Sequence, residues 1–192
     1  MNLPITEIQP GAYICANGLT MYFESCGAGI PVILLHGGLE TCRMWAPVAP
    51  ILAGKYRVIT PDSRGHGRTD NPSGEISYRL MAEDIAHLIQ GLGLKRPFVA
   101  GYSDGGQVAL CMAMHYPGLA RGYMVGAAEL HMTDAWSQMM QLGLGFDAPG
   151  SVDTDRVSRN NPDLVQSLQE KHDIFHQPGY WKTLWTRRRV VG

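Results

Sequence analysis

Short apolar runs alternate along the chain with segments whose apolar residues recur at helical spacing. The strand-like runs are residues 31–38, 56–62, 97–102 and 122–128. The helix-like segments are residues 41–54, 77–93 and 105–116. Unbroken apolar strands are typically covered on both faces, so this alternation predicts an α/β fold with a doubly wound, mostly parallel sheet.

The sequence ahead of the first run predicts an N-terminal β-hairpin. In "YICANGLTMYFES" (13–25), Asn17 and Gly18 form a dipeptide that tolerates the positive φ angles of a type I′ turn. With these two residues as the loop, Cys15 faces Thr20, and Cys26 lies too far along the partner strand for a disulfide. We therefore expect reduced thiols at all four cysteines, which are Cys15, Cys26, Cys42 and Cys111.

The clearest helical pattern begins after Ser77, which is placed to cap a helix. Apolar residues then recur at the 3.6-residue period, and Gly91 and Gly93 end the element. The residues of this apolar stripe are Met81, Ile85, Leu88, Ile89 and Leu92.

The pattern changes after residue 128. The remaining sequence is rich in Met, Gln and Asp, contains helix-like stretches at 134–144 and 162–175, and has no convincing strand. We therefore predict the N-terminal part of an α/β core over residues 1–128 and an incomplete helical cap or lid over residues 129–192.

Composition narrows the class of partner. The 192 residues are 45% hydrophobic, enough for one substantial core, and 16 Lys and Arg balance 17 Asp and Glu. Such a balance favours neither nucleic acid nor an anionic membrane. The N-terminus lacks the pattern of a signal peptide, and no apolar run approaches the roughly 20 residues that span a bilayer. We expect a cytoplasmic protein with a small-molecule substrate.

The candidate chemistry lies at "GYSDGG" (101–106), a G-x-S-x-G motif between a strand-like run and a helix-like segment. A serine hydroxyl is a poor nucleophile unless it is held within reach of a base and of oxyanion-stabilising donors. A sharp strand-to-helix turn would hold Ser103 in this way, in a strained conformation. Gly101 and Gly105 would leave room for the chain crossing, and Gly106 for close helix packing.

Two main-chain amides are candidates for binding an oxyanion. The N–H of Asp104 lies at the start of the predicted helix, where amides have no intrahelical partner. The N–H of Gly38 belongs to "LLHGG" (34–38), a second glycine turn after a buried strand.

Three motifs in this order and spacing resemble the α/β-hydrolase superfamily, especially its small bacterial esterase-like and C–C-hydrolase-like members. They are "HGG" (36–38), "DSRGHGRTD" (62–70) and "GYSDGG" (101–106), and the resemblance covers residues 12 to 185. It implies that Ser103 is the nucleophile, that Gly38 and Asp104 form the oxyanion hole, and that a cap begins at Glu129.

The same resemblance assigns a bracing role to the loop that contains Asp62, Arg64 and Gly65. It also implies a triad in chain order Ser, Asp or Glu, then His, with the last two after the cap. In the superfamily, these last two residues lie on two strands that follow the cap. This chain ends in "TRRRVVG" (186–192) where the two strands should follow. We therefore expect a C-terminally truncated sequence, with a basic C-terminal tail as the alternative.

Seven histidines are candidates for the missing base. His36 and His66 are predicted to orient the main chain, His87 to lie on the polar side of a helix, and His115 to point away from the serine. His131, at the mouth of the site, is the best replacement among them.

Two further features of the predicted cap could be catalytic or could be purely structural. His172 and His176, spaced i, i+4, could share a metal ion, but no third ligand is nearby, and a solvated cap face is favoured. Glu129 could act as the triad acid, whereas a capping or hinge role is favoured.

The leading hypothesis is a serine hydrolase that acts on a carboxylic ester or related small acyl substrate through an acyl-enzyme, without metal or organic cofactor. Without the triad acid and His, the chain is expected to be weak or inactive. A C–C-bond hydrolase would use the same residues, and a non-catalytic ligand-binding remnant is the alternative outside enzymes. Nucleotide binding is disfavoured, because G-x-G-x-x-G spacing and a P-loop lysine are lacking.

The predicted truncation also has a consequence for assembly. The strand at 122–128 would become an open sheet edge beside an uncovered apolar face. We therefore expect self-association of the chain through this edge.

Overall fold

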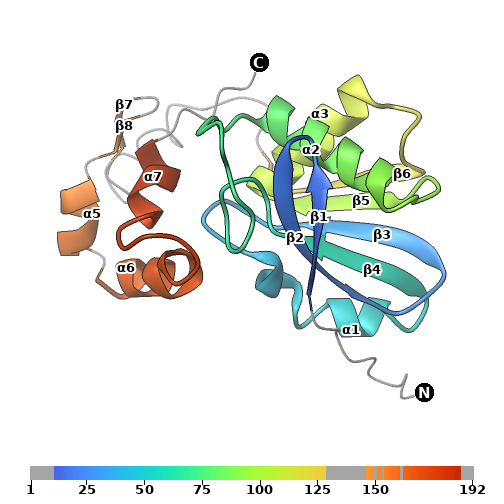
Figure 1. The fold of residues 1–192 in the computed structure, drawn as a ribbon, viewed down its shortest axis with the longest axis horizontal. Helices are drawn as coiled ribbons and strands as arrows, with labels where there is room; N and C mark the ends of the chain where they lie inside the picture. The colour runs from blue at the N-terminus through green and yellow to red at the C-terminus, as the bar shows by residue number, and fades with distance from the viewer. Residues whose placement is uncertain (1–10, 129–145, 149–150, 153, 161, 187–192) are drawn as a thin grey trace.

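The computed structural model describes residues 11–128, 146–148, 151–152, 154–160 and 162–186. A six-stranded sheet in the order β1-β2-β4-β3-β5-β6 forms the centre of the structure (Figure 1). Its strands are β1 (Ala12–Ala16), β2 (Leu19–Cys26), β3 (Ile30–Leu35), β4 (Tyr56–Pro61), β5 (Phe98–Tyr102) and β6 (Gly122–Gly126). Strands β4, β3, β5 and β6 pair in parallel, whereas β1 and β2 are antiparallel, so the predicted mostly parallel sheet is confirmed.

Helices cover both faces of this sheet. Helices α2 (Tyr78–Gly91) and α3 (Asp104–His115) lie on one face, and α1 (Ala49–Leu52) lies on the other (Figure 1). Alternate residues of β3 point into two separate clusters, with Ile33 in the larger one and Val32 in the smaller. The period of two along each strand therefore supplies both cores.

The segment 41–54 differs from the single helix that its sequence predicts. It forms a 3-10 turn, η1 (Cys42–Trp45), and the separate short helix α1. Pro47 lies between the two and has no N–H group with which to continue a helical hydrogen-bond pattern. Pro50 is accommodated because it occupies the first turn of α1, where its missing N–H costs no hydrogen bond.

The N-terminal hairpin is confirmed in its turn and register. Asn17 and Gly18 have φ angles of 50° and 73°, and Cys15 pairs with Thr20 across the ladder. All four cysteines are free, and of these Cys15 alone is exposed.

Helix α2 also follows its sequence pattern. The Oγ of Ser77 accepts a hydrogen bond from the N–H of Leu80 at 3.2 Å, and the helix ends at Gly91. The side chains of Met81, Ile85 and Leu88 are buried against the sheet.

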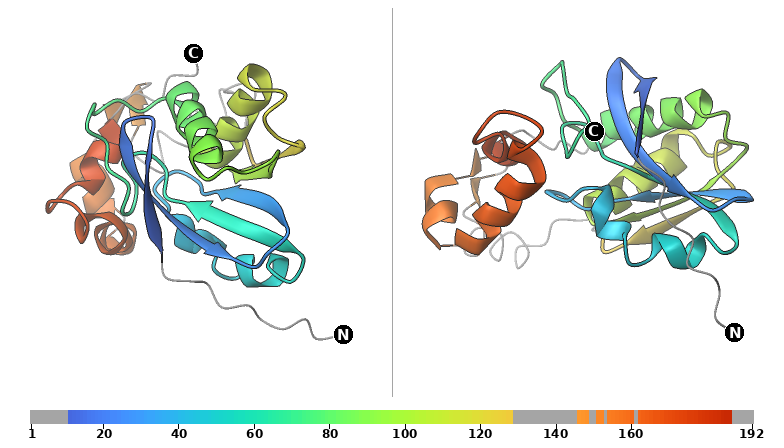
Figure 2. Two further views of the ribbon diagram at one scale, coloured as in Figure 1. Left: turned by 45° about the vertical axis from the view of Figure 1, so that its right-hand side comes forward. Right: turned by 60° about the horizontal axis from the view of Figure 1, so that its bottom comes forward.

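The C-terminal elements lie beside one end of the sheet (Figure 2). They are β7 (Phe146–Ala148), β8 (Ser151–Val152), α5 (Thr154–Asn160), α6 (Pro162–Leu168), the π-helical turn η2 (Gln169–Asp173) and α7 (Trp181–Thr186). The predicted helix over 162–175 is present as α6 and η2. The prediction that this region lacks strands is wrong, because β7 and β8 pair, although each is too short to show an alternating pattern.

Several sequence predictions fall outside the described residues. These are the helix at 134–144, the roles of Glu129 and His131, and the basic C-terminal tail. The division of the chain at residues 128 and 129 stays a prediction. No helix in the described ranges is long and apolar enough to cross a bilayer.

Strand β6 lies at the edge of the sheet as the structure describes it, paired with β5 alone. Met124 is 71% exposed and Val125 is 43% exposed, so apolar side chains project on both faces of this edge. Phe98 and Tyr102 of β5 extend the exposed apolar surface. An edge strand with exposed apolar side chains is a template for pairing with another chain.

We expect self-association of the protein through β6. Size-exclusion chromatography with light scattering should give a mass above that of one chain at high concentration, and replacing Met124 and Val125 with Lys should lower it. Tyr13→Lys, on the opposite edge strand, is the control and should leave the mass unchanged. A monomer at every concentration would contradict the expectation.

Candidate active site at the ends of β3 and β5

Ser103 occupies the sharp turn between β5 and α3. Its φ of 54° and ψ of −118° lie in a region that residues with a side chain rarely adopt. Two main-chain hydrogen bonds hold the turn, from the N–H of Ser103 to the carbonyl of Gly126 at 2.8 Å and from the N–H of Gln107 to the carbonyl of Ser103 at 3.0 Å. The residue is only half-buried. The strained turn expected from the sequence is therefore present, and Ser103 is partly exposed to solvent.

Close approach of main-chain segments explains the glycines around Ser103. A Cβ on Gly101 would overlap the carbonyl group of Gly105, and a Cβ on Gly105 would overlap the carbonyl group of Leu35. A Cβ on Gly106 would lie 2.8 Å from the carbonyl oxygen of Gly126. Side chains at these positions would push α3 away from the ends of three strands.

The second glycine turn lies directly beside this one. Strands β3 and β5 are parallel neighbours, so their carboxyl ends meet at the same edge of the sheet. A Cβ on Gly37 would lie only 3.4 Å from the Cβ of Ser103. The fold therefore brings the Gly38 turn, Ser103 and the start of α3 at Asp104 to one place. Their roles as nucleophile and oxyanion hole stay predictions.

The carboxylate of Asp104 is itself anchored. The hydroxyl of Tyr78, at the start of α2, donates to its Oδ1 at 2.9 Å. A carboxylate in the first turn of α3 also interacts favourably with the positive end of the helix dipole. The side chain thus helps to fix the start of α3.

The loop after β4 is held by two buried acidic residues. The first, Asp62, is 1% exposed and accepts hydrogen bonds from the N–H groups of Cys42 and Arg68 at 2.7 and 2.9 Å. It thereby connects the two segments that follow β3 and β4.

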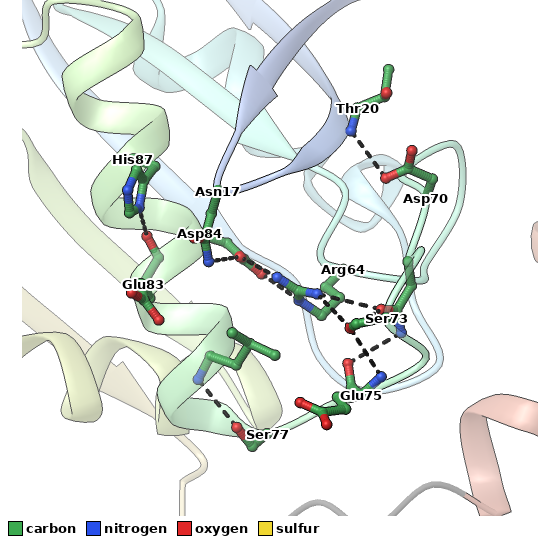
Figure 3. Close-up of polar contacts among 12 residues, drawn as sticks. Asn17, Thr20, Arg64, Asp70, Ser73, Glu75, Ser77, Glu83, Asp84 and His87 are labelled. Atoms are coloured by element: carbon green, nitrogen blue, oxygen red, sulfur yellow. Dashed lines mark hydrogen bonds and ion pairs between the residues drawn. The ribbon is translucent and has the colours of Figure 1, made fainter.

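The second acidic residue, Asp84 of α2, forms a two-point ion pair with Arg64 (Figure 3). The Nε and Nη2 atoms of Arg64 lie 2.8 and 2.6 Å from its two carboxylate oxygens, and both side chains are buried. Asn17 donates to the same carboxylate at 2.8 Å. Burial raises the pKa of Asp84, while the hydrogen bonds from Arg64 and Asn17 oppose the rise.

This geometry supports the bracing role that the resemblance implies for Asp62 and Arg64. Sequence reasoning did not find Asp84 or Asn17 as partners. A signal was available, because Asp84 interrupts the buried stripe of α2 between Met81 and Leu88. A charged residue on an apolar stripe needs a partner in the core.

Buried histidines contact the main chain. His36 Nε2 accepts a hydrogen bond from the N–H of Ser63 at 2.9 Å, so Nδ1 carries the proton and donates to the carbonyl of Gly37 at 2.7 Å. Burial lowers the pKa of His36, which keeps the ring neutral. His66 Nδ1 lies 2.9 Å from the carbonyl oxygen of Arg64. These contacts fit the predicted orientation of the main chain by both residues.

The prediction that His172 lies on a solvated face is wrong. Its side chain is 0% exposed and links two core loops. Nδ1 accepts from the N–H of Gly67 at 3.1 Å, so Nε2 carries the proton and donates to the carbonyl of Leu39 at 3.1 Å. The i, i+4 spacing could not reveal this burial, because the partners lie more than 100 residues away in the chain. His176 stacks on Tyr180 instead, with ring centroids 3.8 Å apart.

His87 and His115 are exposed, in agreement with their predicted positions. Within the described ranges, no three His, Cys, Asp or Glu side chains are grouped so that they could hold a metal ion.

Comparison with known proteins identifies the family. The family model described as the alpha/beta hydrolase fold matches residues 30–190. The soluble epoxide hydrolase of Corynebacterium sp. (strain C12) is 31% identical over 157 residues, which are 81% of this chain and 52% of that protein. The 2-hydroxymuconate semialdehyde hydrolase of Pseudomonas sp. (strain CF600) is 30% identical over 179 residues, which are 91% of this chain and 58% of that protein.

A solved structure, that of the epoxide hydrolase CorEH without ligand, superimposes with a TM-score of 0.69 at 24% identity, over 93% of this chain and 71% of that chain. The chain belongs to the α/β-hydrolase family. It spans about half the length of the curated relatives it matches.

The buried pair of Arg64 and Asp84 generates a prediction for stability. Asp84→Asn should lower the free energy of unfolding by about 3 to 5 kcal/mol, because it leaves the buried guanidinium without its counter-charge. Urea denaturation measures this change. Glu83→Gln, the neighbouring helical position, is the matched control and should change stability by under about 0.5 kcal/mol. Equal, small effects for both variants would contradict the importance of the pair.

His172 makes stability depend on pH. Burial lowers its pKa from 6.5 to about 4; His36 and Lys171 add to this lowering, and the hydrogen bond to Leu39 and the charge of Asp62 oppose it. Because the unfolded chain binds the proton more tightly, this contribution is complete above pH 6.5 and is lost as the pH falls toward about 4.

We expect this histidine to account for a loss on the order of 3 kcal/mol between neutral pH and its folded-state pKa. Unfolding free energies measured across that interval should fall more steeply for the wild type than for His172→Gln. His87→Gln, at an exposed histidine, should retain the wild-type slope. Parallel curves for the wild type and His172→Gln would show that His172 titrates normally.

Proposed function

We propose that this protein is a serine hydrolase that cleaves a carboxylic ester or a related small acyl substrate through an acyl-enzyme on Ser103. The observation that carries the proposal is the strained, half-buried turn at Ser103, which lies against the glycine turn at 37–38. Proteins maintain such strain where the surrounding structure enforces it, and it concentrates at active sites. The proposed reaction uses no metal or organic cofactor and no macromolecular partner.

The proposed chemistry proceeds in two steps. The Oγ of Ser103 adds to the carbonyl carbon, and the N–H groups of Gly38 and Asp104 stabilise the oxyanion. Collapse of the tetrahedral species breaks the bond to the leaving alcohol, which takes up a proton, and leaves an ester on Ser103. Water then hydrolyses this ester and releases the acid.

A base must accept the proton of the Ser103 hydroxyl, and we do not assign this role to the buried histidines. His36, His66 and His172 each direct a ring nitrogen to a main-chain group, and exposed His87 does the same. Loss of the triad base lowers the rate of such enzymes by roughly 10⁴- to 10⁶-fold, although the oxyanion hole sustains a residual rate. We therefore expect a first acylation of Ser103 to be measurable even where a base is lacking.

A serine at position 103 favours acyl substrates over the epoxides named in two of the similar proteins. Attack of a hydroxyl on an epoxide carbon would form an ether, which water does not cleave under mild conditions. Attack on a carbonyl carbon forms an ester, which the same oxyanion donors can help to hydrolyse. The identity of the nucleophile thus narrows the proposed substrate class.

A second candidate is a hydrolase of carbon–carbon bonds. The relative named 2-hydroxymuconate semialdehyde hydrolase matches 91% of this chain, and a semialdehyde has no ester bond to hydrolyse. Such a reaction would use the same serine and oxyanion donors on a ketone tautomer of the substrate, with a carbanion as leaving group. Side chains of the substrate pocket, rather than Ser103, would distinguish the two.

The test is covalent labelling of Ser103 by a fluorophosphonate, followed by peptide mass spectrometry. We expect up to one label per chain at Ser103, and a slow burst of nitrophenol from a short-chain nitrophenyl ester. Ser103→Ala should abolish both signals. Ser25→Ala, a partly buried serine on β2, is the matched control and should react as the wild type does.

Absence of labelling at Ser103 in the folded wild type would overturn the proposal. Such a result would favour a protein that binds a small ligand without chemistry.

A further inference from the structure

The turn that carries Gly38 is held from several sides. The carbonyl of Gly37 accepts hydrogen bonds from His36 Nδ1 at 2.7 Å and from the N–H of Glu40 at 3.3 Å. In a planar trans peptide, the N–H of the following residue points opposite to this carbonyl. The two hydrogen bonds therefore set the direction in which the N–H of Gly38 points.

The next residue, Leu39, is strained. Its φ of 61° lies in the left-handed region, which is unfavourable for a residue with a side chain. The carbonyl of Leu39 is the group that accepts the hydrogen bond from His172 Nε2. Beside it, Lys171 Nζ lies 2.8 Å from Glu40 Oε1. Two consecutive residues of η2 thus hold the two residues that follow Gly38.

His172 also ties this turn to the loop after β4, through the N–H of Gly67. The rings of His36, His66 and His172 are successive neighbours, with centroid separations of 5.2 and 5.7 Å. An apolar side chain would fill the same volume without the cost of burying an imidazole. The polar ring is useful here because it can make two hydrogen bonds at once to main-chain groups of different loops.

We infer that His172 is a positioning residue that holds the strained Leu39 turn and thereby keeps the N–H of Gly38 aimed at the oxyanion. The inference rests on the proposed function and extends it, because it makes the C-terminal helices part of the oxyanion hole. It assigns His172 no contact with the substrate and no proton transfer.

Two substitutions at His172 distinguish the proposed positioning role from a general contribution to stability. In His172→Gln, the side-chain amide nitrogen occupies a place similar to that of Nε2 and can still donate to Leu39. In His172→Asn, the shorter side chain can accept from Gly67 but does not reach Leu39. Gln169→Ala, an exposed position on the same turn, is the matched control.

The first measurement is the second-order rate constant for fluorophosphonate labelling of Ser103. We expect His172→Asn to lower it by about tenfold or more, since loss of one oxyanion donor costs 10²- to 10³-fold. His172→Gln should stay within about threefold of the wild type, although its unfolding free energy falls as that of His172→Asn does. Equal rates for the Asn variant and the wild type, or equal losses in both variants, would overturn the inference.

The second measurement is amide hydrogen exchange at Glu40 in the unreacted protein, because the N–H of Glu40 donates to the carbonyl of Gly37 within this turn. Exchange should accelerate in His172→Asn and remain near the wild-type rate in His172→Gln and Gln169→Ala. If the wild type fails to label, the proposed function is wrong, and exchange alone decides whether His172 holds the turn. Unchanged exchange in His172→Asn would overturn the inference whatever the labelling result.

Discussion

The close approach of two glycine turns at neighbouring strand ends is the constraint on which this site depends. A side chain at Gly105 would collide with the carbonyl groups of Leu35 and His36, and a Cβ on Gly37 would lie 3.4 Å from the Cβ of Ser103, so the chain after β3 and the turn at Ser103 are in contact. Parallel pairing of β3 with β5 produces the juxtaposition, and the crossing of α3 over the strand ends maintains it. The chemistry proposed for Ser103 needs this proximity, because one oxygen atom must meet amides from both turns.

Local patterns allowed much of the fold to be predicted. The Asn17 and Gly18 turn, the cap at Ser77 and the strained turn at Ser103 depend on neighbours within a few residues, and each is present. Segment 41–54 was less predictable, since two prolines weaken a helical pattern without deciding where the helix breaks.

Contacts between distant segments account for what sequence reasoning missed. The burial of His172 depends on Leu39 and Gly67, and the partners of Asp84 are Arg64 and Asn17. A single sequence contains no periodicity that links such positions. A charged residue on the apolar stripe of a helix does indicate a buried partner, although it does not identify that partner. Asp84 could have been recognised in this way as part of a buried ion pair.

The buried network has a consequence for how the protein unfolds. It consists of Arg64, Asp84 and Asn17. Asn17 and Asp84 are 67 positions apart in the chain, and Arg64 lies on an irregular loop between them. Charges this deeply buried are released only when the hairpin, the loop and α2 separate together. The loop, which has no regular secondary structure to stabilise it, therefore belongs to the same cooperative unfolding unit as the central sheet.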